Sequence, residues 1–194
     1  IEARGVRVLR GDICRVKDET ARTIQQFEQA QVDLIVTLHL AYSPSLESAD
    51  ILASSQLPLL MLDTTMDAAF GQDVSPDRIM FNHGIHGVQD LASVLRRKGK
   101  NFEIVAGHVA NPEVLDRAAG IARAARAAKC LRTTRALRIG TAFEGMGDFA
   151  PPDAVLERVL GIDAEQINVE ELEAEAVFVT EDALEEEIAH DRTR

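Results

Sequence analysis

Hydrophobic residues along the chain follow two different periods. Continuous apolar runs predict strands buried on both faces, whereas apolar residues that recur every three or four positions predict helices. Ala21, Ile24 and Phe27 mark the first predicted helix. The runs that predict strands are "VRVL" at 6–9, "DLIVTLHL" at 33–40, "LPLLMLD" at 57–63, "FEIVAGH" at 102–108 and "ALRIGTAF" at 136–143.

Capping residues divide the remaining helical pattern. Ser45 can cap a short helix, and Asn111 followed by Pro112 predicts the start of a long alanine-rich helix. Another helix follows the stretch "MFNHGIHGVQDL" and ends at Gly99. The stretch "DAVLERVLGI", after Pro151 and Pro152, is ambiguous: its composition favours a helix, and partly extended structure is the alternative.

Strands that alternate with helices pair in parallel through right-handed crossovers. The expected fold class is therefore α/β, with two doubly wound parallel-sheet (flavodoxin-like) units. We expect a boundary near residues 98–100, which gives a first unit at 1–99 and a second, incomplete unit at 100–194.

Composition and charge exclude several classes of function. The formal net charge is −11, so the chain lacks the basic surface that nucleic acids require. It has no Trp and one Tyr, which also argues against stacking on bases. No apolar run is long enough for a membrane span and no signal peptide is evident, so we expect a cytoplasmic location. Because the chain opens at Ile1 in a strand-like segment, we also expect that residues precede it in the natural protein.

Candidate chemistry gathers where the predicted strands end. In open parallel sheets, ligands bind beyond the carboxyl ends of the strands. His39, Asp63 and His108 end predicted strands, and Phe143 with Glu144 follows another. Each also has an ordinary structural interpretation: a histidine can sit near the core, Asp63 can cap a turn, and the acids of "FEGMGDF" can be turn residues.

His83 and His86 leave three interpretations open. Two imidazoles at this spacing can share a metal, although a site needs three or four ligands and the nearest acid is Asp90. One histidine can instead cap the helix while the other is solvated. In the third interpretation, Gly84 and Gly87 permit a turn into a helix whose start and imidazoles face a polyhydroxylated or anionic ligand.

Five stretches together resemble the L-fucose/L-arabinose isomerase family in their order and spacing. The resemblance covers residues from about Val6 to about Leu172. The stretches are "VTLHLAYSPS", "LPLLMLDTT", "FNHGIHGVQDL", "VAGHVANPEV" and "IGTAFEGMGDF".

The resemblance implies a metal-dependent aldose–ketose isomerase that acts on a pentose or deoxyhexose through an enediol. Family members use a divalent metal, usually manganese, and form homo-oligomers whose active sites lie between subunits. The residues that the resemblance assigns to the monosaccharide substrate are His83, His86 and Phe143. His83 stands where arabinose isomerases have a glutamine and Phe143 where they have a methionine, and "FEGMGDF" fits a fucose-isomerase-like branch better.

The family's metal ligands come from a later part of a longer chain, and no counterpart is found in this sequence. The resemblance therefore implies truncation at both ends, with the first unit lacking the family's first strand and helix. We expect this chain to bind no metal by itself, and we assign it no catalytic residue. Two functions stay open: a fragment of the isomerase, inactive alone, or a non-catalytic α/β module for sugar binding or assembly.

Overall fold

The computed structural model describes residues 1–149 and 151–193. The chain forms two compact units, Ile1–Ala127 and Ala128–Arg194. The predicted boundary at residue 99 therefore falls inside the first unit. The reason is that the strand after this position pairs with the preceding strand of the same sheet, and the helix that follows it packs against that sheet.

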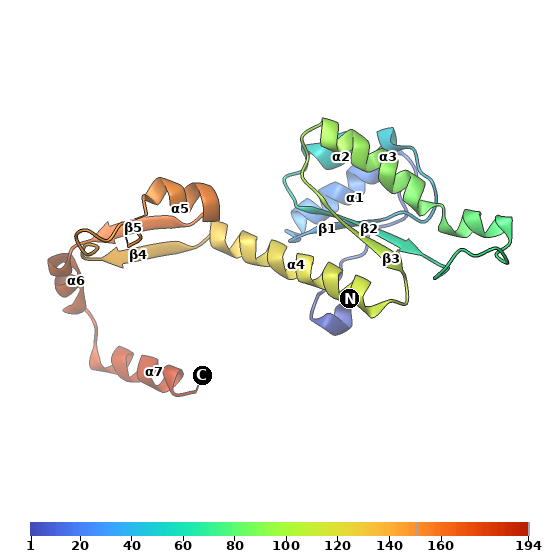
Figure 1. Cartoon of the computed structure of the whole chain (residues 1–194). Helices are drawn as coiled ribbons and strands as arrows, with labels where there is room; N and C mark the ends of the chain where they lie inside the picture. The colour runs from blue at the N-terminus through green and yellow to red at the C-terminus, as the bar shows by residue number, and fades with distance from the viewer. Residues whose placement is uncertain (150, 194) are drawn as a thin grey trace. The chain divides into compact units, whose positions relative to one another are not determined.

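Unit 1 contains a parallel three-stranded sheet in the order β1-β2-β3 (Figure 1). The strands are β1 (Ile35–Leu38), β2 (Leu59–Thr65) and β3 (Glu103–His108). Leu38 is the register partner of Leu62 on β2, and Thr65 is the partner of His108 on β3. This registration brings the carboxyl ends of all three strands to one edge of the sheet.

Helices cover both faces of this sheet because the side chains of β2 alternate between two cores. Leu59 and Met61 join the cluster formed with α1, α2 and α3, whereas Leu60 and Leu62 join the cluster formed with α4. Strands buried on both faces need apolar residues at consecutive positions, as β2 has from Leu59 to Leu62. The helices and short 3-10 segments of unit 1 are η1 (Glu2–Arg4), α1 (Lys17–Gln29), η2 (Ser45–Glu47), α2 (Ala49–Ser54), η3 (Pro76–Asn82), α3 (Gly84–Arg97) and α4 (Pro112–Arg132), the last of which continues into unit 2.

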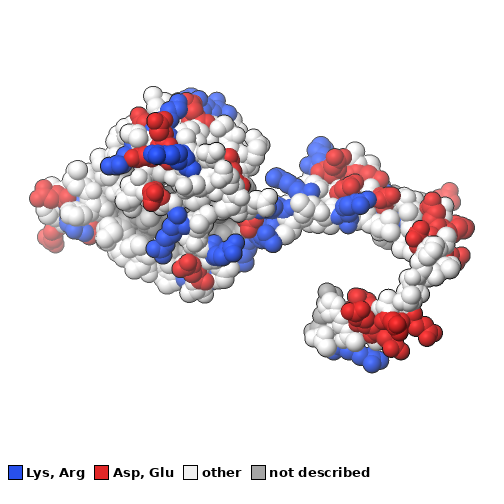
Figure 2. Space-filling view, turned by 180° about the vertical axis from the view of Figure 1, so that it is seen from behind, with Lys and Arg blue, Asp and Glu red and all other residues white. Residues whose placement is uncertain are grey.

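Unit 2 has a parallel pair of strands, β4 (Arg135–Ile139) and β5 (Asp163–Ile167), with α5 (Asp153–Leu160) between them in sequence. Two acidic helices follow, α6 (Val169–Ala176) and α7 (Glu181–Asp191). Neither α6 nor α7 contains a buried residue. Figure 2 shows the acidic side chains gathered over these C-terminal helices. Much of the net negative charge thus lies on solvated helix surfaces.

The α/β class with parallel, helix-flanked sheets is confirmed. The strand predicted at 6–9 is wrong, because residues 6–15 form no regular secondary structure and Val8 and Leu9 are exposed. A strand needs a neighbour to accept and donate its ladder hydrogen bonds, and this segment pairs with none of β1–β5. The strand predicted to reach residue 143 ends at Ile139, because Gly140 takes a φ of 74° that breaks extended backbone.

Candidate functional site

The start of α3 lies against the loop that follows β1. A Cβ atom at Gly84 would lie 2.5 Å from the carbonyl oxygen of His39. A Cβ atom at Gly87 would lie 2.7 Å from His39 Cδ2 and 3.2 Å from the backbone nitrogen of Ser43. Both glycines are therefore required by close packing rather than by loop flexibility. They bring the first turn of α3 to the carboxyl end of the sheet.

His83 and His86 lie side by side at this helix start. Their ring centroids are 4.5 Å apart with an edge-on geometry, and the ring of Tyr42 lies 5.7 Å from that of His83. His83 is half-buried and His86 is exposed. His83 is the N-cap residue by position, but its side chain makes no capping hydrogen bond. The two imidazoles thus form an accessible pair near the carboxyl end of the sheet.

A buried asparagine fixes the loop that leads into this helix. Asn82 Oδ1 accepts hydrogen bonds from the backbone nitrogens of Met66 (2.8 Å) and Asp67 (3.1 Å). Its Nδ2 donates to Asp67 Oδ2 (2.6 Å) and to the carbonyl of Arg78 (2.9 Å). Arg78 in turn makes two hydrogen bonds to the Asp67 carboxylate, at 2.8 and 2.9 Å. The Arg78 guanidinium, with help from Asn82, holds the pKa of Asp67 below its usual value.

The end of β3 is tied to the same loop. His108 Nε2 lies 3.1 Å from the carbonyl oxygen of Met66, and the backbone nitrogen of Val109 donates to the carbonyl of Thr65. His108 is therefore engaged in holding the loop after β2, which agrees with its structural interpretation rather than with a ligand-binding role.

His39 and Asp63 lie in a more buried position. Asp63 is 7% exposed, and burial raises the pKa of its carboxyl, an effect that the nearby His39 partly offsets. Burial lowers the pKa of His39, and the charge of Asp63 acts in the opposite direction. Asp63 is thus withdrawn from solvent, and His39 is half-buried.

The chemistry expected of a divalent metal can be tested against the side chains present. Among residues 1–149 and 151–193, no group of three or more His, Cys, Asp or Glu residues could hold a metal ion. His83 and His86 offer two imidazole nitrogens at most, and a typical site needs three or four protein ligands. The described residues therefore do not fit a metal site.

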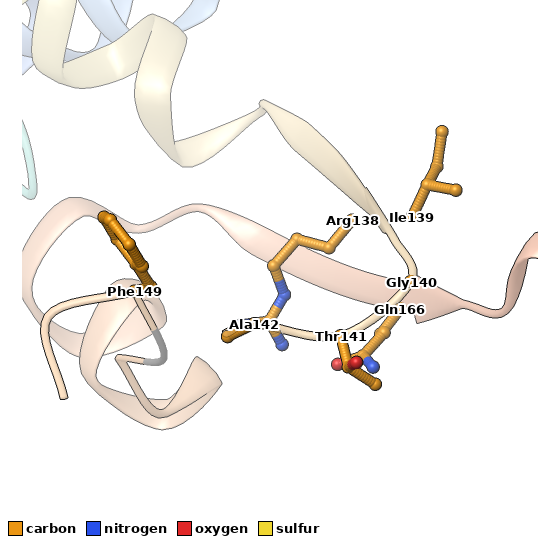
Figure 3. Close-up of a pocket in the computed structure, with 7 residues that line it drawn as sticks. All are labelled: Arg138, Ile139, Gly140, Thr141, Ala142, Phe149 and Gln166. Atoms are coloured by element: carbon orange, nitrogen blue, oxygen red, sulfur yellow. The ribbon is translucent and has the colours of Figure 1, made fainter. Parts of the chain in front are cut away.

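Phe143 belongs to unit 2, in the loop after β4. Its side chain is 77% exposed, and its ring centroid lies 6.0 Å from that of Phe149. A pocket of about 460 Å³ opens near this loop, at the carboxyl ends of β4 and β5 (Figure 3). In Figure 3 the side chain of Arg138 extends toward Ala142, whereas that of Ile139 points away from it. Arg138 forms an ion pair with Asp153 at 2.5 Å.

Comparison with known proteins now identifies the family. The L-arabinose isomerase N-terminal domain matches residues 3–133, which is most of the chain. The chain belongs to the L-arabinose isomerase N-terminal domain family. It is also 30% identical over 144 residues to an L-arabinose isomerase of a Nocardioides species. That alignment covers 74% of this chain but 28% of the relative, so the chain spans little more than a quarter of the relative's length.

These matches confirm that the chain belongs to the isomerase family that the sequence resembles, on its arabinose side. The family match ends at residue 133, before the "FEGMGDF" stretch on which the fucose-isomerase-like interpretation rests. That interpretation, and the assignment of His83, His86 and Phe143 to a sugar, stay predictions. In the described part of the chain, no helix combines the length and apolar character needed to cross a membrane.

Sequence reasoning missed the residues that support the pair of histidines. Asn82, Asp67 and Arg78 form their network across a loop, and no periodic pattern marks such contacts. The available signal was position: Asn82 immediately precedes the histidine motif, and a buried asparagine beside a turn commonly bonds to backbone groups.

Proposed function

We propose that this chain supplies a sugar-facing surface of a metal-dependent aldose–ketose isomerase that acts on a pentose or deoxyhexose through an enediol. The observation that carries the proposal is the accessible His83–His86 pair, packed through Gly84 and Gly87 against the carboxyl end of a parallel sheet. Family membership and the location of ligand sites in such sheets both support it.

Each residue of this surface has a definite part in the proposal. An imidazole can donate one hydrogen bond and accept another, which suits the hydroxyl groups of a monosaccharide. His86 is the exposed member of the pair and contacts the sugar directly. His83 lies between His86 and Tyr42, so it orients the pair and discriminates between sugars. In unit 2, and as a separate contact, Phe143 offers an exposed aromatic face for the apolar side of a sugar ring.

The metal, manganese in the proposal, would be held by polypeptide other than the described residues, since these provide no suitable group of ligands. When bound, such an ion polarises the oxygens of the sugar. We assign this chain the binding and orientation of the sugar and no proton transfer. We further propose that the protein forms a homo-oligomer in the cytoplasm. The net charge of −11 favours partners other than nucleic acids.

The test is isomerase activity of the complete gene product that contains this chain, assayed with Mn²⁺ and L-arabinose or L-fucose. His86→Ala should lower kcat/KM at least about tenfold through the loss of a hydrogen bond to substrate. His190→Ala is the matched control, because His190 is an exposed histidine of α7. Full activity of the His86 variant in a correctly folded protein would refute the role of this residue.

A second function is a non-catalytic module that binds a sugar or serves assembly. The favouring observation is that, among residues 1–149 and 151–193, no group of three or more His, Cys, Asp or Glu residues could hold a metal ion. Calorimetry of the chain with L-arabinose and L-fucose, without metal, separates the two. Binding by the chain alone supports the module, whereas binding that requires the complete gene product supports the isomerase.

A further inference from the structure

Three polar side chains lie near the start of α3: Thr37 and His39, which are half-buried, and Asp63, which is buried; we call them the polar cluster. Leu38 pairs with Leu62 across β1 and β2, so the next residues along the two chains, His39 and Asp63, are neighbours. Strand alternation places Thr37 on the same face as its register partner Met61, and Asp63 on that face two residues further along β2. This is the face that α3 covers.

The cluster has polar atoms without hydrogen-bond partners in the protein. The Thr37 hydroxyl and His39 Nδ1 are buried, and neither has a partner among the described residues. The Asp63 carboxylate lies beside them on a residue that is 7% exposed. Buried polar groups in this condition destabilise the folded state, whereas apolar residues of similar size would pack at this position without that penalty. Packing alone therefore does not account for the choice of residues.

The cluster contacts the helix that carries the two exposed imidazoles. The His39 ring approaches Gly87 through Cδ2, and the His39 carbonyl approaches Gly84. His83 and His86 flank these glycines in the first turn of α3. Because His39 packs directly against both glycines, a displacement of His39 bears on where this turn places the other two imidazoles.

We propose that Asp63 and His39 are positioning residues: the charge of the Asp63 carboxylate acts on the neighbouring His39 imidazole, and this residue, packed against Gly84 and Gly87, sets where the first turn of α3 places His83 and His86. Thr37 completes the cluster as the nearby hydroxyl. The relevance to a sugar rests on the proposed function, but the positioning does not involve any ligand. It can therefore be tested, and can fail, independently of isomerase activity.

Asp63→Asn is the informative variant because it keeps the shape of the side chain and removes its charge. Histidine ring resonances are followed by NMR on the 194-residue chain across a pH titration. We expect the pKa of His39 to fall relative to the unmodified chain, since the attraction of the Asp63 charge is lost. The ring resonances of His83 and His86 should also move, while those of His190 in α7 stay unchanged.

Two outcomes would overturn the proposal. Unchanged titration of His39 in Asp63→Asn means that the carboxylate does not act on the ring. A changed pKa of His39 with unmoved ring resonances of His83 and His86 means that Asp63 and His39 interact but do not position the first turn of α3. If the variant does not fold, the unmodified chain still gives a test: nuclear Overhauser contacts must join the Hδ2 proton of His39 to the Hα protons of Gly87, and their absence refutes an oriented ring.

Discussion

The carbonyl oxygen of His39 lies where a side chain at Gly84 would have to be, 2.5 Å from the position of its Cβ atom. His39 follows β1, and Gly84 begins α3, 45 positions later (84 − 39). This one contact joins the carboxyl end of the sheet to the helix that bears both candidate sugar-binding histidines. This contact explains the glycine at position 84 of the motif "HGIHG". The close approach of His39 Cδ2 and the Ser43 nitrogen explains the glycine at position 87.

Gly84→Ala and Gly87→Ala should each destabilise unit 1. A methyl group at either position overlaps atoms of His39, and overpacking of this kind costs about 1–3 kcal/mol. Urea unfolding followed by circular dichroism measures the change. Gly120→Ala is the control, since Gly120 lies inside α4 and its nearest obstacle is the flexible end of Arg123 at 4.0 Å.

That control should behave in the opposite way. Alanine is the better helix former by about 1 kcal/mol, so Gly120→Ala should leave stability unchanged or raise it. Equal effects of all three substitutions would contradict the close packing of α3 on the loop after β1.

Asn82→Ala should loosen the loop between β2 and α3. The substitution removes the acceptor for the backbone nitrogens of Met66 and Asp67, and the donor to Asp67. A loss of about 2 kcal/mol follows from leaving such groups unpaired. Thermal unfolding measures it, with the exposed Asn101→Ala as the control, which should change stability by less than about 0.5 kcal/mol. Equal melting temperatures of Asn82→Ala and Asn101→Ala would contradict the proposal that Asn82 anchors this loop.

The stability of unit 1 should depend on the ionisation of His39. Burial lowers the pKa of His39 below its ordinary 6.5 in the folded state, so the unfolded chain binds the proton more tightly. The His39 contribution to stability is therefore fully present above pH 6.5 and is lost as the pH falls from there through the lowered pKa.

Unfolding free energies measured between pH 5 and pH 8, about the ordinary value for histidine, test this dependence. His39→Gln should flatten the decline that the unmodified chain shows on acidification. Asp63 has the opposite sign, because burial raises the pKa of its carboxyl above 3.8 and thereby favours the folded state at low pH. A decline of the same steepness in His39→Gln would assign the effect to other groups.

Sugar preference should respond to His83 if the proposed function holds. His83 stands beside both Tyr42 and His86, so a change of side chain alters the whole pair. In the complete gene product, His83→Gln should shift the ratio of kcat/KM for L-arabinose over L-fucose by several-fold, since one hydrogen bond is worth about 1 kcal/mol. A ratio that stays constant, with both activities intact, would exclude His83 as a specificity residue.

Local patterns of residues were sufficient to predict several helices and strands of this protein. Apolar spacing predicted the helices at Lys17–Gln29 and Gly84–Arg97, and Asn111 with Pro112 predicted the start of the long helix at Pro112–Arg132. The continuous apolar run of β2 correctly indicated burial on both faces. These features follow from periodicity and capping, which involve residues close together in the chain.

Strand pairing and unit boundaries could be established only from the folded chain, because they depend on residues far apart in the sequence. "VRVL" has the composition of a strand but pairs with no other strand, and β3 joined the sheet of unit 1 although the sequence placed it in a second unit. The neighbours of His39, namely Asp63 and the glycines of α3, come from register and helix packing. Local patterns encode which face a residue occupies, but the free energy that selects its partner comes from contacts between segments far apart in the chain.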